Sequence, residues 1–349
     1  MRTRRERIYY LDIARGISIL AVIWGHIMLS GWTNVLVYAF DIPLFLFLSG
    51  MMFHPDRIKT FAALLKRLFR KLLVPYFLFG TGTYFVWLLY NHVIHREIKS
   101  YTEPFLQLFL AYGSSDYIRQ DPPLWFVTCL VVIQILYFLF RKYTNETTTV
   151  LLSVGCGILG YILVGHNLVE LPWNFESAMS AMPFFCAGNL FAAHAGYDGI
   201  IRFYDDHKKK LLLPTILFSV VFIIGALWNG HITLGSNVLG KSTLVLYLIG
   251  AIGIYLVLIT AVFIYRTLKP AIYRGIMWFG ENSFFVMAAH IPIKRFIVAA
   301  LASAMDVKRS TIQNAETYSL IAFVFSVAIT AVVVEILNIC VRKVKIRHS

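Results

Sequence analysis

Long apolar runs follow one another along the whole chain, and each is close to the length of about 20 residues that crosses a bilayer as a helix. The runs are continuous rather than alternating, which excludes a membrane β-barrel. They predict an all-α fold, a polytopic membrane helix bundle of about ten transmembrane helices. The expected spans are 8–29, 33–53, 72–91, 123–140, 150–165, 177–194, 211–229, 243–265, 283–304 and 317–341. We expect residues 1–349 to form a single membrane-embedded domain.

The composition argues against a soluble domain and against a nucleic-acid-binding protein. Hydrophobic residues make up 58% of the chain and charged residues 14%, against about 45–50% and about 25% in soluble domains. A chain with so few polar residues cannot cover a soluble domain. The net charge of +14 does not predict a nucleic-acid partner, because basic residues in a membrane protein usually mark cytoplasmic loops. The four cysteines lie in apolar runs without CxxC spacing, so we expect neither a disulfide framework nor a metal site.

The distribution of Lys and Arg predicts the orientation. If the N-terminus lies in the cytoplasm, 23 of these residues fall in cytoplasmic segments and 6 in outer loops. Under the positive-inside rule, this bias predicts that both termini face the cytoplasm.

The first expected span carries residues that are costly inside a membrane. Arg15 lies about two turns into it, where an arginine costs about 2.5–3.5 kcal/mol. His26 follows eleven residues later, which places both side chains on one helix face, about 16.5 Å apart along the axis. Asp12 is one turn before Arg15 and can pair with it. Taken singly, such an arginine often reaches the interface and such a histidine often joins two helices. Their common face favours a polar cavity.

Two arginines open the third expected span. Arg67 and Arg70 are three residues apart in a basic run. Guanidinium groups suit phosphate, so we consider a phosphate clamp. Ordinary positive-inside charge and binding of anionic lipid headgroups are the alternatives.

Other polar positions give weaker signals. Ser49, beside Gly50, permits close helix approach. Trp125 opens the fourth span, where an interfacial aromatic belt is the alternative. His290 precedes Pro292, which predicts an interrupted ninth span of the kind that borders cavities. Four further ionisable residues lie in apolar runs without an evident partner, namely Asp41, Lys294, Arg295 and Glu335.

Residues 235–242 fit the Walker A pattern letter for letter. A P-loop works between a strand and a helix of a soluble α/β unit. Here the pattern lies in an expected outer loop between two spans, so we interpret it as a chance match.

Taken together, these residues resemble a known family. Arg15 and His26, with ten residues between them, and residues 10–17 around the arginine resemble the opening of the acyltransferase 3 family of bacterial integral membrane acyltransferases, especially its fucose 4-O-acetylase-like branch. Residues 67–70 are similar to the family's second signature, two arginines three apart. Its lesser landmarks resemble, in the same order, residues 43–50, 123–126, 183–188 and 280–283 with His290.

The resemblance implies ten core spans in the bacterial cytoplasmic (inner) membrane. It also implies transfer of an acyl group, most often acetyl from acetyl-CoA, to a hydroxyl of an extracytoplasmic or lipid-linked carbohydrate. The expected partners are therefore membrane lipid, acyl-CoA as co-substrate, and a carbohydrate acceptor. The alternative is a transporter of lipid-linked sugars or organic anions, which intramembrane Arg and His and a proline-broken helix serve equally well. Consumption of the thioester distinguishes the two.

The residues then take definite expected roles. Arg67, Arg70 and Arg15 bind the phosphates of acyl-CoA near the cytoplasmic face. The acyl carbonyl reaches His26, which acts as general base toward the acceptor hydroxyl, and Asp12 orients Arg15.

Three further residues complete the expected site on the acceptor side. These acceptor-binding residues are Trp125, Ser49 and His290.

Overall fold

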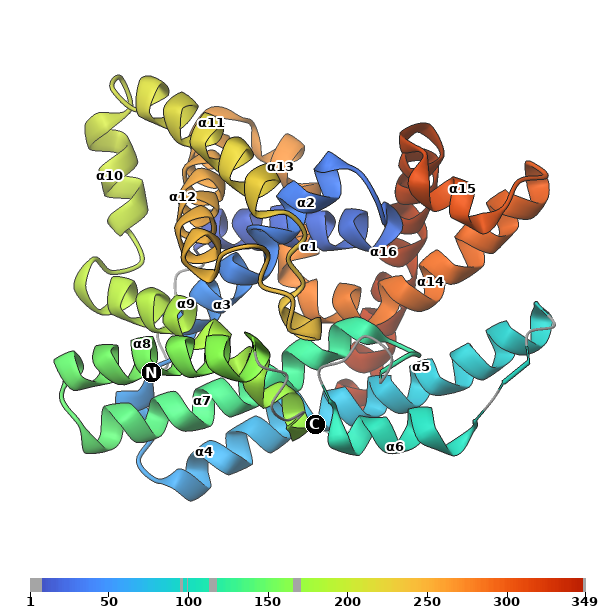
Figure 1. The fold of residues 1–349 in the computed structure, drawn as a ribbon, viewed down its shortest axis with the longest axis horizontal. Helices are drawn as coiled ribbons and strands as arrows, with labels where there is room; N and C mark the ends of the chain where they lie inside the picture. The colour runs from blue at the N-terminus through green and yellow to red at the C-terminus, as the bar shows by residue number, and fades with distance from the viewer. Residues whose placement is uncertain (1–7, 95–96, 99, 113–117, 166–170, 348–349) are drawn as a thin grey trace.

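The chain is helical throughout the part that the structure describes. The computed structural model describes residues 8–94, 97–98, 100–112, 118–165 and 171–347. Within these ranges the only β pairing is an isolated bridge between Thr233 and Val238, so the all-α prediction is confirmed (Figure 1). The α-helices are α1 Tyr9–Ile27, α2 Trp32–Tyr38, α3 Asp41–Met52, α4 Phe61–Leu68, α5 Val74–Val93, α6 Thr102–Leu110, α7 Trp125–Tyr143, α8 Glu146–Gly165, α9 Phe175–His194, α10 Gly199–His207, α11 Leu212–Asn229, α12 Thr243–Thr267, α13 Pro270–Glu281, α14 Ser283–Ala304, α15 Arg309–Asn314 and α16 Glu316–Arg347.

Five shorter segments link these helices. Four are 3-10 turns and one, η2, is a π-helix that joins α4 to α5. They are η1 Pro55–Arg57, η2 Phe69–Leu73, η3 Pro122–Leu124, η4 Pro172–Asn174 and η5 Leu234–Ser236.

Nine helical stretches in the described residues are long and apolar enough to cross a membrane. They agree with nine of the ten expected spans and make the chain a multi-pass membrane protein. The one expected span outside this set, at residues 177–194, is a 20-residue helix, α9. It contains Glu176 and Asn189, and most of its residues are buried among other helices. Polar side chains on such a helix can hydrogen-bond to neighbouring helices, as Asn189 does with the backbone oxygens of Gly50 and Phe53.

The structure corrects two details of the expected spans. The second span is not one helix, because it breaks after Tyr38 into α2 and α3. The ninth span was expected to be interrupted at Pro292, but α14 runs continuously through that proline. Neighbouring helices and local adjustment can compensate the single backbone hydrogen bond that a proline removes.

Some of the basic residues that predict the orientation lie outside the described residues, namely Arg2, Arg4, Arg5, Arg7, Arg96 and Lys99. The cytoplasmic location of both termini therefore stays a prediction.

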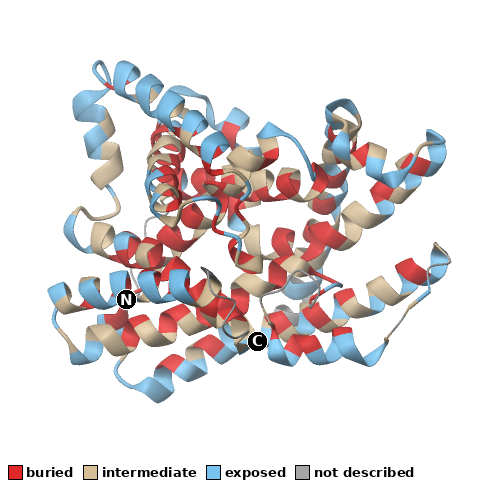
Figure 2. Cartoon of the chain, viewed as in Figure 1, coloured by how far each residue is buried: buried red, intermediate tan, exposed pale blue. Residues whose placement is uncertain are grey.

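Helix α1 forms the centre of the bundle. It packs against α2, α3, α12, α13, α14 and α16, and in Figure 1 it lies between α14–α16 on one side and α11 and α12 on the other. Figure 2 shows buried residues along α1 and exposed ones along the outer faces of α8 and α11. On α11 the exposed residues include Leu212 and Leu213. A continuous apolar outer surface on a helix long enough to cross a membrane indicates contact with lipid tails.

Two reciprocal glycine contacts allow the closest helix crossings. A Cβ atom at Gly16 of α1 would overlap the carbonyl oxygen of Ile276 in α13, and one at Gly280 of α13 would overlap that of Asp12. The crossing of α3 and α9 repeats the arrangement with Gly50 and Gly188. Small residues of this kind let membrane helices pack backbone to backbone. The two crossings fix the residues that directly precede Gly16 and Gly50, which are Arg15 and Ser49.

The α3–α9 crossing predicts a measurable stability difference between two glycine substitutions. Gly188→Ala places a methyl group against the Phe47 carbonyl, and overpacking of this kind costs typically about 1–3 kcal/mol. We expect a lower thermal unfolding temperature for the detergent-purified protein. Gly82→Ala is the control, because a Cβ at Gly82 meets no atom within 4 Å. An equal loss in both variants would contradict the close crossing.

Candidate functional site

One face of α1 forms a wall of a cavity inside the bundle. The cavity has a volume of about 180 Å³ and is lined by Arg15, Ile19, Val22 and His26. Their spacing of four, three and four residues keeps all four on one helix face. The structure thus confirms that Arg15 and His26 share a face, and it shows that this face borders a cavity.

Helix α3 supplies a second wall. Asp41, Phe45 and Ser49, each four residues apart, line the same cavity. Ser18 of α1 donates a hydrogen bond to the Asp41 backbone oxygen at 3.0 Å, which joins the two walls. The Asp41 carboxylate accepts from the Ile42 amide at 2.6 Å, and the residue is 1% exposed. Sequence analysis identified Asp41 only as an ionisable residue without an evident partner.

The remaining walls come from distant parts of the chain. Trp125 and Phe126 open α7, Tyr38 ends α2, and residues 233–235 belong to the loop between α11 and α12. Leu72 of η2 and residues of α14 complete the lining. The α14 residues are Ser283, Phe284 and Met287.

Arg15 lies at one end of the α1 stripe, paired with Asp12. The guanidinium Nη1 is 3.3 Å from the Asp12 carboxylate, and the two side chains are 26% and 13% exposed. The predicted i,i+3 pair is therefore confirmed. A half-buried pair of this kind compensates the charge of Arg15, while the arginine side chain still borders the cavity.

His26 lies at the other end, among aromatic and basic groups. Its ring centroid is 6.2 Å from that of Tyr38, edge to face, and 5.3 Å from that of His290. His290 is fully buried, and its Nδ1 lies 3.0 Å from the Val286 carbonyl oxygen. Its Nε2 has no hydrogen-bond partner among the described residues. The structure therefore brings His290 beside His26, but not into the cavity lining as expected for an acceptor-binding residue.

The two basic residues of α14 hold neighbouring elements in place. Lys294 donates to the backbone oxygen of His26 at 2.6 Å. This carbonyl is in the last turn of α1, where carbonyls lack helical partners and cations are favoured. Arg295 donates to the backbone oxygen of Gln120 at 2.8 Å and also to that of Arg119, just before α7. The two residues therefore connect α14 to the helix ends that carry His26 and Trp125.

The turn after α1 completes this end of the site. Gly31 has φ +105°, a value that L side chains rarely adopt, and the chain reverses there into α2. Asn34 of α2 donates to the backbone oxygens of Gly25 at 2.9 Å and Met28 at 2.6 Å. These bonds satisfy further carbonyls at the end of α1 and place Tyr38 against the cavity.

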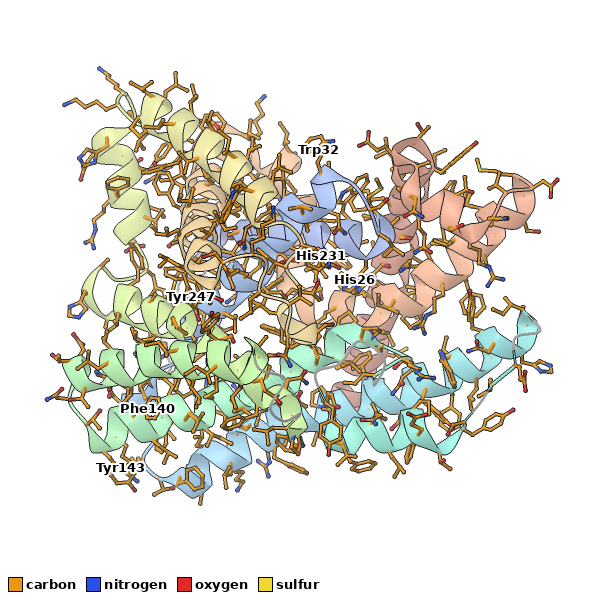
Figure 3. The ribbon with its side chains drawn as sticks, in the orientation of Figure 1. His26, Trp32, Phe140, Tyr143, His231 and Tyr247 are labelled. Atoms are coloured by element: carbon orange, nitrogen blue, oxygen red, sulfur yellow. The ribbon has the colours of Figure 1, made fainter. Side chains whose placement is uncertain are left out.

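The loop between α11 and α12 also contacts this end of the cavity. The ring of His231 is 5.6 Å from that of Tyr38, and its Nε2 lies 2.7 Å from the Thr233 hydroxyl. Partial desolvation lowers the pKa of the His231 imidazole below its ordinary value, although the side chain is still exposed. Figure 3 shows His231 and His26 at the same part of the bundle. The Walker-like residues 235–242 lie in this loop, which has a 3-10 turn and one isolated bridge, and not between a strand and a helix.

Arg67 and Arg70 do not line the cavity. Arg67 is half-buried, with its guanidinium carbon 5.7 Å from the centroid of the Phe53 ring. Arg70 is exposed and belongs to η2, the same π-helix whose Leu72 reaches the cavity. π-Helical turns are rare and frequently occur at functional sites.

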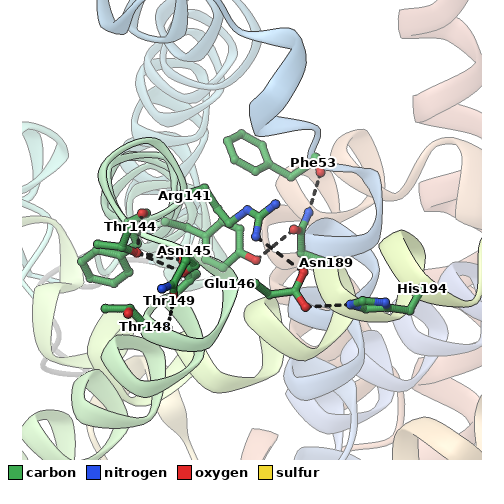
Figure 4. Close-up of polar contacts among 11 residues, drawn as sticks. Phe53, Arg141, Thr144, Asn145, Glu146, Thr148, Thr149, Asn189 and His194 are labelled. Atoms are coloured by element: carbon green, nitrogen blue, oxygen red, sulfur yellow. Dashed lines mark hydrogen bonds and ion pairs between the residues drawn. The ribbon is translucent and has the colours of Figure 1, made fainter.

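A polar cluster lies beyond Phe53 (Figure 4). Asn189 donates to the Phe53 carbonyl at 2.6 Å and accepts from the Tyr137 hydroxyl at 2.9 Å. Glu146 joins Arg141 at 3.6 Å and His194 at 2.8 Å. The carboxylate of Glu146 compensates the positive charge of Arg141. The cluster is therefore a poor binding site for an anion.

Four of the residues predicted from sequence thus meet at one cavity: Arg15, His26, Ser49 and Trp125. The lining also includes residues that sequence analysis did not select, such as Tyr38 and Gly235. Their only signals were an aromatic residue near a span end and a glycine inside a rejected motif. Among the described residues, no group of three His, Cys, Asp or Glu side chains could hold a metal ion.

Comparison with known proteins adds one finding. A family model described as an acyltransferase domain matches residues 8–337, which include every residue of the cavity. No curated protein and no solved structure gives a significant match.

The cavity predicts different reactivities for two introduced cysteines. In a chain whose four native cysteines are replaced, Ser49→Cys places a thiol on the cavity wall, whereas Ser18→Cys places one at a fully buried position. We expect a small water-soluble thiol reagent to label Ser49→Cys at least about tenfold faster, because reactivity follows exposure of the thiolate. Both changes conserve side-chain size. Equal labelling rates would contradict a reagent-accessible cavity at Ser49.

Proposed function

Because the chain belongs to the acyltransferase 3 family, we propose that it transfers an acyl group from acyl-CoA on the cytoplasmic side to a hydroxyl of an extracytoplasmic or lipid-linked carbohydrate. Family membership supports acyl transfer to carbohydrates in general. The finer assignments, acetyl-CoA as donor, the fucose 4-O-acetylase-like branch and the bacterial cytoplasmic membrane, belong to this proposal.

One observation carries the proposal. Arg15 and His26 stand about 16.5 Å apart along one helix, and a single cavity borders both. A substrate such as acyl-CoA has an anionic nucleotide at one end and a thioester at the other. An arginine at one end of the cavity and an imidazole at the other match these two ends.

The cavity is too small to enclose the whole donor. Its volume of about 180 Å³ is below the roughly 300–1,000 Å³ of pockets for drug-sized ligands. We therefore assign the nucleotide to Arg67 and Arg70, outside the cavity, with Arg15 contacting its phosphates from one end of the cavity. Only the acyl end of the donor enters the cavity. Leu72 supports a donor path from the two arginines to the cavity, because it lies two residues after Arg70 in η2 and lines the cavity.

The proposed reaction is a direct acyl transfer. The acceptor oxygen attacks the thioester carbonyl carbon, the new C–O bond forms, and the C–S bond breaks. A neutral His26 takes the hydroxyl proton, which then passes to the leaving CoA sulfur. Lys294 fixes the backbone of this residue, and Arg15, oriented by Asp12, binds the phosphate-bearing side of the donor.

Trp125 and Ser49 provide the acceptor side of the site in this proposal. An indole offers an apolar face against a sugar ring, and a hydroxyl can donate or accept a hydrogen bond. His290 helps to position the ring of His26, at 5.3 Å between centroids.

Replacing the proposed base should abolish most of the activity. With membranes containing the chain and acetyl-CoA labelled in its acetyl group, we expect His26→Ala to transfer label to envelope glycans about 10²–10⁴-fold more slowly, the range that general acid–base groups contribute. His92→Ala changes an exposed histidine of α5 that does not line the cavity and should retain native activity. Equal transfer by all three proteins would refute His26 as base. Absence of CoA release from the native chain would favour a transporter.

The two arginines should govern donor affinity rather than chemistry. Charge-assisted hydrogen bonds are worth about 1.5–3 kcal/mol, so Arg67→Gln or Arg70→Gln should raise the KM for acetyl-CoA by about tenfold or more, with little change in kcat. Arg57→Gln removes an exposed arginine of η1 outside the cavity and serves as the control. A change in kcat at constant KM would argue against a phosphate clamp.

A further inference from the structure

A second, larger hollow lies on the outside of the bundle, between α8, α9 and α12. We call it the α8–α12 groove, and its volume is about 710 Å³. Apolar and aromatic side chains form most of its walls, including Ile158 and Tyr161 of α8, Phe184 of α9, and Leu244 and Tyr247 of α12. Figure 3 labels Tyr247, which donates to the Ser180 backbone oxygen at 2.9 Å. Because α8 and α12 are long and apolar enough to cross a membrane, we expect hydrocarbon chains to surround this groove.

The groove has one charged end. Lys241 lines it together with Ser242 and Thr243, and its ammonium lies 5.8 Å from the Trp228 ring centroid. The lysine is exposed, and it stands at the start of α12, where the helix end also favours an anion. An apolar channel with a single cation at its rim is complementary to a lipid tail that carries a phosphate.

The same loop borders both the groove and the catalytic cavity. Residues 233–235 line the cavity, and residues 241–242 line the groove. The six residue-to-residue steps from Gly235 to Lys241 span at most about 20–22 Å when fully extended. Gly235 lies against the indole of Trp125, so close that a Cβ atom would overlap the ring.

Hydrogen bonds hold this loop in a defined shape. Asn229 accepts from the Ser242 amide at 2.8 Å and donates to the Leu239 backbone oxygen at 3.3 Å. Ser177 of α9 donates to the Leu234 backbone oxygen at 2.7 Å. The loop therefore sets the position of Lys241 relative to the cavity.

We propose that the α8–α12 groove binds the hydrocarbon anchor of a lipid-phosphate-linked acceptor, with Lys241 on the phosphate. The sugar then reaches across residues 233–235 to Trp125 and His26. This inference rests on the proposed function and narrows its acceptor to one that is attached to a lipid. A bulk phospholipid has similar chemistry, and we favour a linked sugar because one fixed loop borders both the groove and the cavity.

Binding can be tested without any acyl transfer. The probe is a polyprenyl phosphate with a photoreactive diazirine in its chain, incorporated with the full chain into phosphatidylcholine nanodiscs and mapped by peptide mass spectrometry. We expect labelled peptides from α8 and α12, and competition by unlabelled polyprenyl phosphate but not by phosphatidylglycerol. Equal competition by phosphatidylglycerol would identify the groove as a site for bulk lipid and overturn the proposal.

Matched variants test the two ends of the groove. Ile158→Trp fills the groove from an exposed position of α8, and Leu159→Trp makes the same change at the next residue, outside the lining. Lys241→Gln removes the rim charge, and Lys308→Gln removes another exposed lysine. We expect Lys241→Gln to lower labelling about fivefold, the contribution of one cation near an anionic lipid surface. Ile158→Trp should lower it further, and both controls should label like the native chain.

Acyl transfer separates this proposal from the one on which it rests. Labelled acetyl should enter the solvent-extractable lipid fraction with the native chain and fall in Ile158→Trp and Lys241→Gln in parallel with photolabelling. Native transfer that neither variant alters would overturn the groove assignment and leave the proposed function intact. Specific photolabelling without CoA release by the native chain would instead contradict the proposed function.

Discussion

A guanidinium group inside a membrane bundle must be both neutralised and kept near polar surroundings, and this requirement governs the placement of α1. Asp12 neutralises Arg15 at 3.3 Å, and the cavity gives the arginine side chain a border that is not lipid. Both conditions need α1 at the centre of the bundle, because a lipid-facing α1 would expose the charge to hydrocarbon. The bare backbone at Gly16 lets α13 close over this charged turn.

The sequence predicts well whatever depends on the repeat of a single helix. Arg15, His26 and Asp12 could be placed relative to one another because a helix has a fixed period. The positions of Arg67 and Arg70 could not be predicted in the same way. The π-helix at Phe69–Leu73 changes the number of residues per turn, and no residue pattern in this segment indicated it. The continuous path of α14 through Pro292 depends likewise on neighbours that the local sequence does not specify.

Residues that act across the fold were harder to identify. Lys294 contacts the carbonyl of His26, 268 positions earlier in the chain, so inspection of α14 alone shows only a basic residue in an apolar run. Tyr38 reaches the cavity because the chain reverses at Gly31, and Gly235 because its loop is tied to α9 through Ser177. These placements are held by hydrogen bonds from side chains of one element to backbone carbonyls of another. A single sequence does not contain that information in a readable form.

The central position of α1 also has a consequence for biogenesis. The surfaces that cover it belong largely to α12, α13, α14 and α16, which leave the ribosome more than 200 residues after α1. During synthesis the Arg15–Asp12 turn therefore lacks these neighbours until the later helices are made. Until then it is in contact with the insertion machinery or with lipid. The cavity beside Arg15 is thus among the last features to be assembled, and a chain truncated before α13 retains the charged helix but lacks the helix that crosses it at Gly16.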